Sequence, residues 1–240
     1  MIAVKIENVK KSYKDTKALK GVSAEIKPGE LYGLLGLNGA GKTTLISIIA
    51  GLTKADDGDI TVGGKSVKTE SDEVKKIIAV SPQETAVAPN LTVKENLEFF
   101  AELYGKPKDR AIIAIQEFGL THVENKRAKT LSGGYARRLS VAAAVITEPE
   151  LLILDEPTLG LDVIARRELW KLIKARKGKT TIMLTTHYLE EVEALCDRIC
   201  LLKEGEKIFE GTVEEMKTLA GQDNFEDAFV KISQGEICRE

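Results

Sequence analysis

The sequence has no long apolar segment, which limits how the chain can meet a membrane. Its longest uninterrupted apolar run is residues 141–146, whereas a helix that crosses a bilayer needs about 20 such residues. Residues 1–5 do not begin the charged and then apolar pattern of a secretory signal. We therefore expect neither a membrane-spanning segment nor a secretory leader in this sequence.

Cysteine is scarce, and neither sign of charge dominates. Cys196, Cys200 and Cys238 are odd in number and lack the spacing of a metal site, which indicates free thiols in a reducing cytoplasm. The 35 basic and 37 acidic residues give a net charge of −2, so no general affinity for nucleic acid is expected. We also find no internal repeat, linker or low-complexity tract, and we expect one domain over residues 1–240.

Residues 36–43 fit the phosphate-binding pattern G-x-x-x-x-G-K-[ST]. An apolar strand is predicted before them at 31–35, and a helix after them at 44–52 with Leu45, Ile48, Ile49 and Leu52 on one face. A glycine loop between strand and helix can direct backbone N–H groups and the positive end of the helix at a polyphosphate. Lys42 can then reach the β- and γ-phosphates, and the Thr43 hydroxyl can ligate Mg²⁺. The candidate phosphate-binding residues are Gly36, Asn38, Gly39, Ala40, Gly41, Lys42, Thr43 and Thr44.

A second apolar run, residues 151–154, ends in two acids. Such a run suits a parallel strand that is covered on both faces and delivers Asp155 and Glu156 to its carboxyl end. We expect Asp155 to hold Mg²⁺, directly or through water, and Glu156 to polarise the attacking water as general base. Two solvated acids at a strand end would be the alternative interpretation.

Ser132, Gly133 and Gly134 precede a helix predicted at about 135–147, and they form a second helix start suited to an anion, with Ser132 as its cap. One phosphate cannot easily use both helix starts of one chain. At this point the sequence resembles the ABC ATPase family, in which the Leu-Ser-Gly-Gly signature of one subunit closes over ATP held by the other. The resemblance implies a head-to-tail dimer, either a homodimer or one with a related ATPase subunit, and ATP and Mg²⁺ at its interface.

The same resemblance assigns four further positions. Tyr13 resembles the aromatic residue that stacks on adenine, and Gln83 resembles the glutamine that senses Mg²⁺ and the membrane partner. Asp162 resembles the aspartate that communicates across the dimer, although a helix cap is its simpler interpretation. His187, at the end of a predicted strand, resembles the switch histidine that contacts the γ-phosphate. The chain departs from the family at Tyr135, where glutamine is usual, followed by residues 136–139.

The resemblance also implies the fold class: α/β, a P-loop NTPase (RecA-like) core with an antiparallel β lobe and an inserted α-helical subdomain. The alternation of Val22, Ala24 and Ile26 fits the lobe. A capping box at Thr92 opens a helix to about Tyr104 in a stretch without strand patterns. We expect the core at about 1–83 and 150–211, the helical subdomain at about 84–149 and a helical tail at about 212–240.

The function implied is that of the ATP-hydrolysing subunit of an ABC transporter, with exporters favoured by resemblance at residues 91–106, 187–205 and 225–229. Such a subunit would work with a separate transmembrane permease subunit at the inner, cytoplasmic face of the membrane. Residues 85–92, next to Gln83, are the expected contact for that subunit.

Two rival functions stay open at this stage. A soluble ABC-type ATPase acting on nucleic acid or ribosomes usually carries a long coiled coil or a second cassette, and neither is visible here. A P-loop GTPase is the other, but residues 125–128 lack the aspartate that selects guanine. Residues 155–158 also lack the glycine of the GTPase switch motif.

Overall fold

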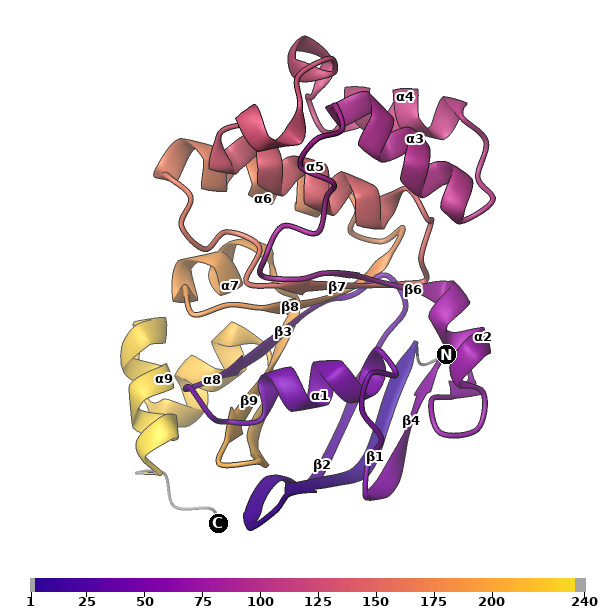
Figure 1. Ribbon diagram of the computed structural model, residues 1–240. Coiled ribbons are helices and arrows are strands. Elements are labelled where there is room, and N and C mark those ends of the chain that lie inside the picture. Colours follow the sequence, from indigo (N-terminus) through magenta and orange to yellow (C-terminus); the bar gives the residue numbers. More distant parts are fainter. Residues whose placement is uncertain (1–2, 236–240) are drawn as a thin grey trace.

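The computed structural model describes residues 3–235, and a mostly parallel sheet runs through its centre (Figure 1). The apolar runs predicted as strands form it because both of its faces are covered, so Leu151–Leu154 and the whole of β8 are buried. Only β10 is antiparallel to its neighbour. The strands, in spatial order, are β10 (Glu206–Gly211), β9 (Arg198–Lys203), β3 (Leu31–Gly36), β8 (Thr181–Thr185), β7 (Leu151–Asp155) and β6 (Ile78–Ser81).

An antiparallel sheet forms the second layer. Its order is β2 (Thr16–Ile26), β1 (Val4–Tyr13), β4 (Asp57–Val62) and β5 (Lys65–Ser66). Val22, Ala24 and Ile26 are buried while the residues between them are exposed, which confirms the predicted alternation. Helix α1 (Lys42–Ile49) lies between this sheet and the parallel one (Figure 1). The short helix α2 (Ser71–Ile77), which the sequence pattern did not predict, leads into β6.

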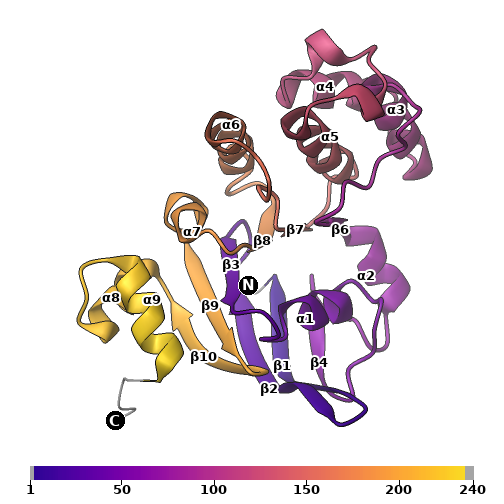
Figure 2. The same cartoon turned by 60° about the vertical axis from the view of Figure 1, so that its left-hand side comes forward.

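Three helices form a separate group at one end of the molecule (Figure 2). They are α3 (Val93–Leu103), α4 (Asp109–Glu117) and α5 (Gly133–Val145), with short 3₁₀ turns at Thr121–Val123 and Ala128–Thr130. The capping box is confirmed, because the Thr92 side chain accepts from the Glu95 N–H and the Glu95 side chain accepts from the Thr92 N–H. The helix ends at Leu103, one residue before the predicted end at about Tyr104, and Tyr104 is exposed.

Alternate residues of β7 show how the layers meet. Leu152 and Leu154 pack with the helices α5, α6 (Val163–Lys174) and α7 (Leu189–Leu195), while Leu151 and Ile153 pack with α1 and the antiparallel sheet. The chain continues into α8 (Val213–Ala220) and α9 (Phe225–Gln234), which have a core of their own against β9 and β10. Cys238 lies outside the described residues.

The predicted bounds of the helix after the glycine loop were wrong at both ends. Helix α1 begins at Lys42, two residues before the expected start, and it ends at Ile49, so Leu52 lies past its end and is 79% exposed. The early start follows from Gly41, whose φ of 105° is left-handed and whose added Cβ would lie 2.6 Å from the Ala18 carbonyl oxygen. Only glycine fits this position, and the helix can begin directly after it.

Candidate functional site

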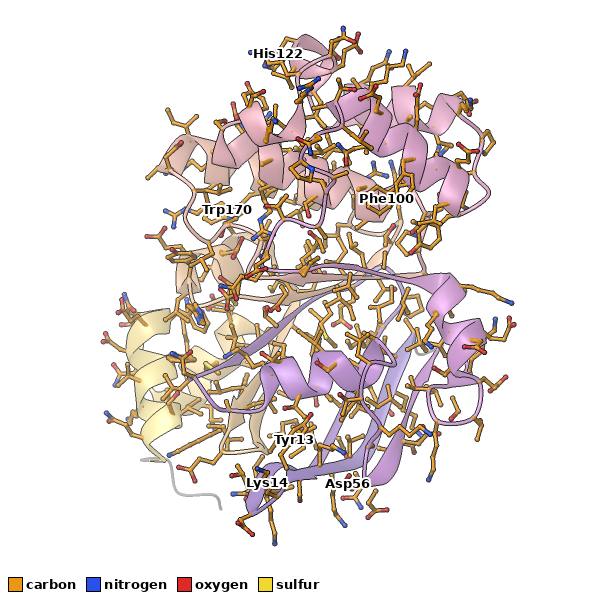
Figure 3. All side chains as sticks on the ribbon, viewed as in Figure 1. Tyr13, Lys14, Asp56, Phe100, His122 and Trp170 are labelled. Carbon is orange, nitrogen blue, oxygen red and sulfur yellow. The ribbon has the colours of Figure 1, made fainter. Side chains whose placement is uncertain are left out.

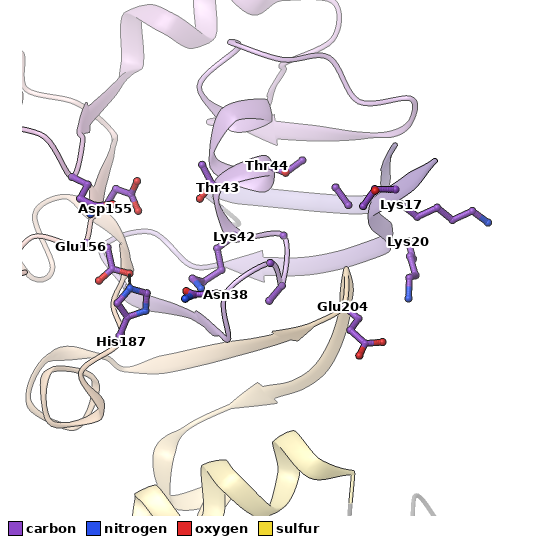
Figure 4. A pocket seen from close by; sticks show the side chains of 16 residues that line it. Lys17, Lys20, Asn38, Lys42, Thr43, Thr44, Asp155, Glu156, His187 and Glu204 are labelled. Carbon is purple, nitrogen blue, oxygen red and sulfur yellow. Dashed lines mark ion pairs between the residues drawn. The ribbon is translucent and has the colours of Figure 1, made fainter. Parts of the chain in front are cut away.

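The carboxyl ends of β3, β6, β7 and β8 meet at one edge of the parallel sheet, which is where α/β proteins bind ligands. A cavity of about 730 Å³ opens there (Figure 4). Asp155, Glu156 and His187 lie at one end of it, and Lys17, Lys20 and Glu204 lie at the other. Its other lining residues are Thr16, Ala18, Asn38, Gly39, Ala40, Gly41, Lys42, Thr43, Thr44 and Gln83.

The glycine loop presents one buried cation to this cavity. Lys42 is 9% exposed, and its ammonium donates hydrogen bonds to the carbonyls of Gly36 at 2.6 Å and Leu37 at 3.3 Å. Burial lowers the pKa of Lys42, while the charges of Glu156 and Asp155 oppose that shift. The loop thus keeps a positive charge next to two acids and beside the N–H groups at the start of α1.

The acidic pair is oriented by the neighbouring strand β8. The Thr185 hydroxyl donates to Asp155 Oδ1 at 2.5 Å, and the Glu156 N–H donates to both the hydroxyl and the carbonyl of Thr185 at 3.1 Å. Glu156 Oε1 lies 3.0 Å from His187 Nε2, and its buried Oε2 has no hydrogen-bond partner among residues 3–235. Burial raises the pKa of Glu156 and Asp155 adds to the rise, which makes this carboxylate a better proton acceptor near neutral pH.

Two features of the cavity differ from what the motifs indicated. Lys17, Lys20 and Glu204 line it, although no sequence pattern pointed to them. Tyr13 is not among the lining residues: it lies at the end of β1, 47% exposed, with Lys11 Nζ 5.4 Å from its ring centre (Figure 3).

The signature segment lies outside this cavity. Ser132 stands at the cap position of α5, but its side chain makes no capping hydrogen bond, so the hydroxyl is available to another group. A Cβ added to Gly134 would lie 2.9 Å from the Ala165 Cβ of α6, and a Cβ on Gly133 would meet Leu161. The signature therefore shares one surface with the loop that carries Asp162.

Asp162 itself caps α6. Its Oδ1 accepts from the N–H groups of Ile164 and Ala165, both at 2.9 Å, which is the simpler of the two interpretations that the sequence allowed. The departure at Tyr135 is accommodated within the helical group, because its ring packs edge-on against His122 at 4.9 Å. Arg138 lies over the same ring at 5.1 Å.

Comparison with known proteins decides the family. The family model described as ABC transporter matches residues 19–159. A linearmycin resistance ATP-binding protein, LnrL, of Bacillus subtilis is 43% identical over 222 residues, which cover 90% of this chain and 71% of the relative. The chain belongs to the ABC transporter family. It is therefore an ATP-binding ATPase, and the family's ATPases associate with membranes through transmembrane partners and dimerise.

Two further comparisons agree with this ABC ATPase assignment. A Nod factor export ATP-binding protein I of Burkholderia orbicola is 42% identical over 216 residues, covering 87% of this chain and 70% of the relative. A dimeric ATP-binding cassette solved in a post-hydrolysis state with ADP and Pi matches with a TM-score of 0.77 and 30% identity, covering 87% of this chain and 98% of that one. These matches confirm the P-loop NTPase fold class. No helix within residues 3–235 has the length and apolar character to cross a bilayer.

Proposed function

We propose that this ABC ATPase powers an exporter whose transmembrane part is a separate permease subunit. The direction of transport is inferred from the relatives, because the names of two of them concern drug resistance and Nod factor export. The observation that supports ATP hydrolysis by this chain is the cavity at the carboxyl edge of the sheet. It is lined by Lys42, Asp155, Glu156 and His187. The alternative of an ATPase acting on nucleic acid or ribosomes is not favoured by these relatives or by the net charge of −2.

In this proposal the glycine loop binds the phosphates of ATP. Lys42 would exchange the carbonyls of Gly36 and Leu37 for β- and γ-phosphate oxygens, which are stronger acceptors for a buried ammonium. The N–H groups around Asn38 and Gly39, together with the side chain of Thr44, would contact the remaining oxygens. Glu156 would accept a proton from the attacking water. His187 lies 3.0 Å from the Glu156 carboxylate, so it would orient that carboxylate, and it would also contact the γ-phosphate.

The oxygen atoms at the acidic end of the cavity fit Mg²⁺. Thr43 and Asp155 face each other there, and Gln83 is a third lining residue (Figure 4). Hydroxyl, carboxylate and amide oxygens are the ligands that this hard cation takes together with substrate phosphates. Bound Mg²⁺ would neutralise charge on the β- and γ-phosphates. Thr185, by donating to Asp155 Oδ1, would leave Oδ2 of that carboxylate free to turn toward the ion.

We further propose that the complete site forms between two chains. Ser132, Gly133 and Gly134 are on the surface, away from the cavity of their own chain, and the Ser132 hydroxyl has no capping bond to satisfy. A head-to-tail dimer with two-fold symmetry would bring this helix start of one chain over the γ-phosphate held by the other. Asp162 would lie at the same interface, and Tyr13, exposed beside β2, would stack on adenine.

The permease would contact the loop after β6. Residues 83–86 of this loop are exposed, and the loop joins the sheet edge at Ser81 to the helical group that begins at Val93. This arrangement supports the proposed division into a core, a helical subdomain over about 84–149 and a tail from about 212. The proposal also locates the chain at the inner face of the membrane. The contact there need not be strongly apolar, because non-obligate interfaces are about as apolar as ordinary protein surface.

Cross-linking in native membranes tests the partner. Single cysteines at Thr85 and Asn90, in a chain with Cys238 replaced by serine, should capture an integral membrane protein when a short cross-linker is added. The matched control is Lys14→Cys, on the exposed turn after β1 at the far end of the molecule (Figure 3). If the chain is recovered only as a free species and positions 85 and 90 capture no membrane protein, the transporter assignment of this chain fails.

A further inference from the structure

Arg137 is a buried cation whose hydrogen bonds all go to the main chain. It lies on α5, is 5% exposed, and its Nη1 donates to the Pro82 carbonyl at 2.6 Å. Its Nη2 donates to the carbonyls of Gln83 at 2.6 Å and Glu156 at 3.1 Å. A planar guanidinium can meet three acceptors in fixed directions, which a lysine ammonium on its flexible stem does less well. One side chain therefore joins three segments of the chain.

These segments are the ones that the proposed reaction must align. Pro82 and Gln83 begin the loop after β6, Glu156 follows β7, and α5 is the helix that opens with the signature. Burial lowers the pKa of Arg137, but Asp155, Glu191 and Glu156 favour its charged form. The desolvated charge is thus retained beside the acids while its donors are directed at backbone carbonyls.

The Glu156 backbone is unusual and needs such support. Its φ of 49° lies in the left-handed region, where the Cβ of a residue with a side chain crowds the backbone. Such a conformation persists only where neighbours fix it from more than one side. Thr185 holds its N–H at 3.1 Å, while its carbonyl accepts from Arg137 Nη2 at 3.1 Å and from the Leu159 N–H at 3.2 Å. Without Arg137, the carbonyl keeps only the local turn bond from Leu159 and loses its link to α5.

We propose that Arg137 is a positioning residue for ATP hydrolysis, joining the Gln83 loop and the signature helix α5 to the main chain of Glu156. The inference rests on the proposed role of Glu156 as general base. Arg137 does not contact the nucleotide cavity, so it acts through the placement of Glu156 and not through ATP binding. A displacement of Pro82 and Gln83 would reach Glu156 through this side chain, in addition to the direct pairing of β6 with β7.

Two variants test the proposal in the full chain. Arg137→Lys keeps the charge, and Arg137→Met removes it without leaving an unpaired buried cation, which protects folding. Both should lower kcat for ATP hydrolysis about 10- to 100-fold, because a displacement of a catalytic group by about 1 Å has effects of this size. The KM for ATP and the Kd of a fluorescent ATP analogue should change less than about threefold, since the phosphate contacts are intact.

The matched control is Arg138→Lys, the next position on α5. Arg138 pairs instead with Glu168 on α6 and lies over Tyr135, so its substitution should leave kcat within about twofold if only the Arg137 contacts matter. Thermal melting of each variant distinguishes a folded protein with a misplaced Glu156 from a protein that has lost its fold. A folded Arg137→Met protein with parental kcat, or one with raised KM and unchanged kcat, overturns the proposal.

A double-mutant cycle identifies the route of action. In a Glu156→Gln background, single-turnover hydrolysis should show no further loss on adding Arg137→Lys, because residues that act as one unit are not additive. An equal further loss would mean that Arg137 acts elsewhere, and the proposal would be wrong. Lys42→Ala serves as a separate check: if it abolishes activity while Arg137 variants are normal, only this inference fails, whereas an active Lys42→Ala protein rejects the proposed function itself.

Discussion

The starts of α1 and α5 are two helix N-termini with very different surroundings. The start of α1 is enclosed: Lys42 is buried and hydrogen-bonded to its own loop, and residues from β2, β7 and the loop after β8 line the same cavity. The start of α5 is open, with Ser132 exposed and no capping bond from its side chain. Both present N–H groups that can bind an anion. Their difference fits the proposal that one chain supplies the phosphate-binding cavity and that its own α5 start is left for the nucleotide of another chain.

The largest effect should come from the enclosed start. Lys42→Ala removes the one side-chain cation of the glycine loop, and charge-assisted hydrogen bonds are worth about 1.5–3 kcal/mol each. ATPase activity should fall below detection, and affinity for ATP should fall about 10- to 100-fold. Phosphate release measures the ATPase activity, and equilibrium binding of a labelled ATP analogue measures the affinity. Near-parental turnover by a purified, folded variant would remove the basis for treating the α1 start as the phosphate site.

The next effect separates binding from chemistry. Glu156→Gln keeps the shape of the side chain but cannot accept a proton, so hydrolysis should slow about 10²- to 10⁴-fold. ATP should remain bound, and the two helix starts should stay together as a dimer that light scattering detects. The comparison would break if the variant stayed monomeric with saturating ATP and Mg²⁺, or if it hydrolysed ATP at the parental rate.

A substitution at the open start should prevent association of the two chains and spare the binding of ATP by each. Ser132→Arg inserts a long side chain where the partner's phosphate would lie, so the dimer of the Glu156→Gln background should not form. Each monomer should still bind ATP with parental affinity, because Ser132 does not line its own cavity. Ser132→Ala is the matched control, and its thermal stability should be unchanged because the hydroxyl makes no capping bond within the chain. Loss of ATP binding by the Ser132→Arg monomer would show that the two starts serve one chain.

The motifs predicted the local structure of the glycine loop because that structure is set by neighbouring residues. A strand, a left-handed glycine and a helix follow one another between Leu31 and Ile49, so residue types at fixed spacing indicate this part of the cavity. Asp155 and Glu156 could be assigned for the same reason, since a buried strand delivers them to the sheet edge. Whether the site residues act as proposed remains for the substitutions above to test.

The sequence could not indicate contacts that depend on packing between distant segments. Arg137 meets Pro82, 55 residues away, and Glu156, 19 residues away, only after α5 packs beside the sheet. Lys17 and Lys20 reach the cavity because β2 passes under the glycine loop, and nothing in their spacing indicates it. Arg137 follows two residues after Tyr135, where the sequence departs from the family, but that departure did not indicate which groups Arg137 contacts.

The smallest effect concerns Glu191, a buried acid whose charge acts on Glu156 of the enclosed site. It is fully buried on α7, its Oε1 accepts from Trp170 Nε1 at 2.8 Å, and its Oε2 has no partner among the described residues. Burial raises the pKa of Glu191 above the unfolded value, and the charge of Glu156 adds to the rise. The protonated acid is therefore favoured in the fold, and its stabilising contribution is present below the unfolded pKa of about 4.3 and lost as pH rises through the folded pKa.

Glu191→Gln should remove this pH dependence, because an amide can accept from Trp170 and cannot ionise. As pH rises from about 5 to about 8, the free energy of unfolding of the variant should increase relative to that of the parent. The increase should be about 1.4 kcal/mol for each unit by which folding raises the pKa of Glu191. Urea unfolding at several pH values measures the difference, with Glu190→Gln as the exposed control on the same helix. Parallel stability curves for Glu191→Gln and the parent would mean that Glu191 ionises as easily in the fold as in the unfolded chain. In that case the interior beside Glu156 would hold a second negative charge in the folded protein.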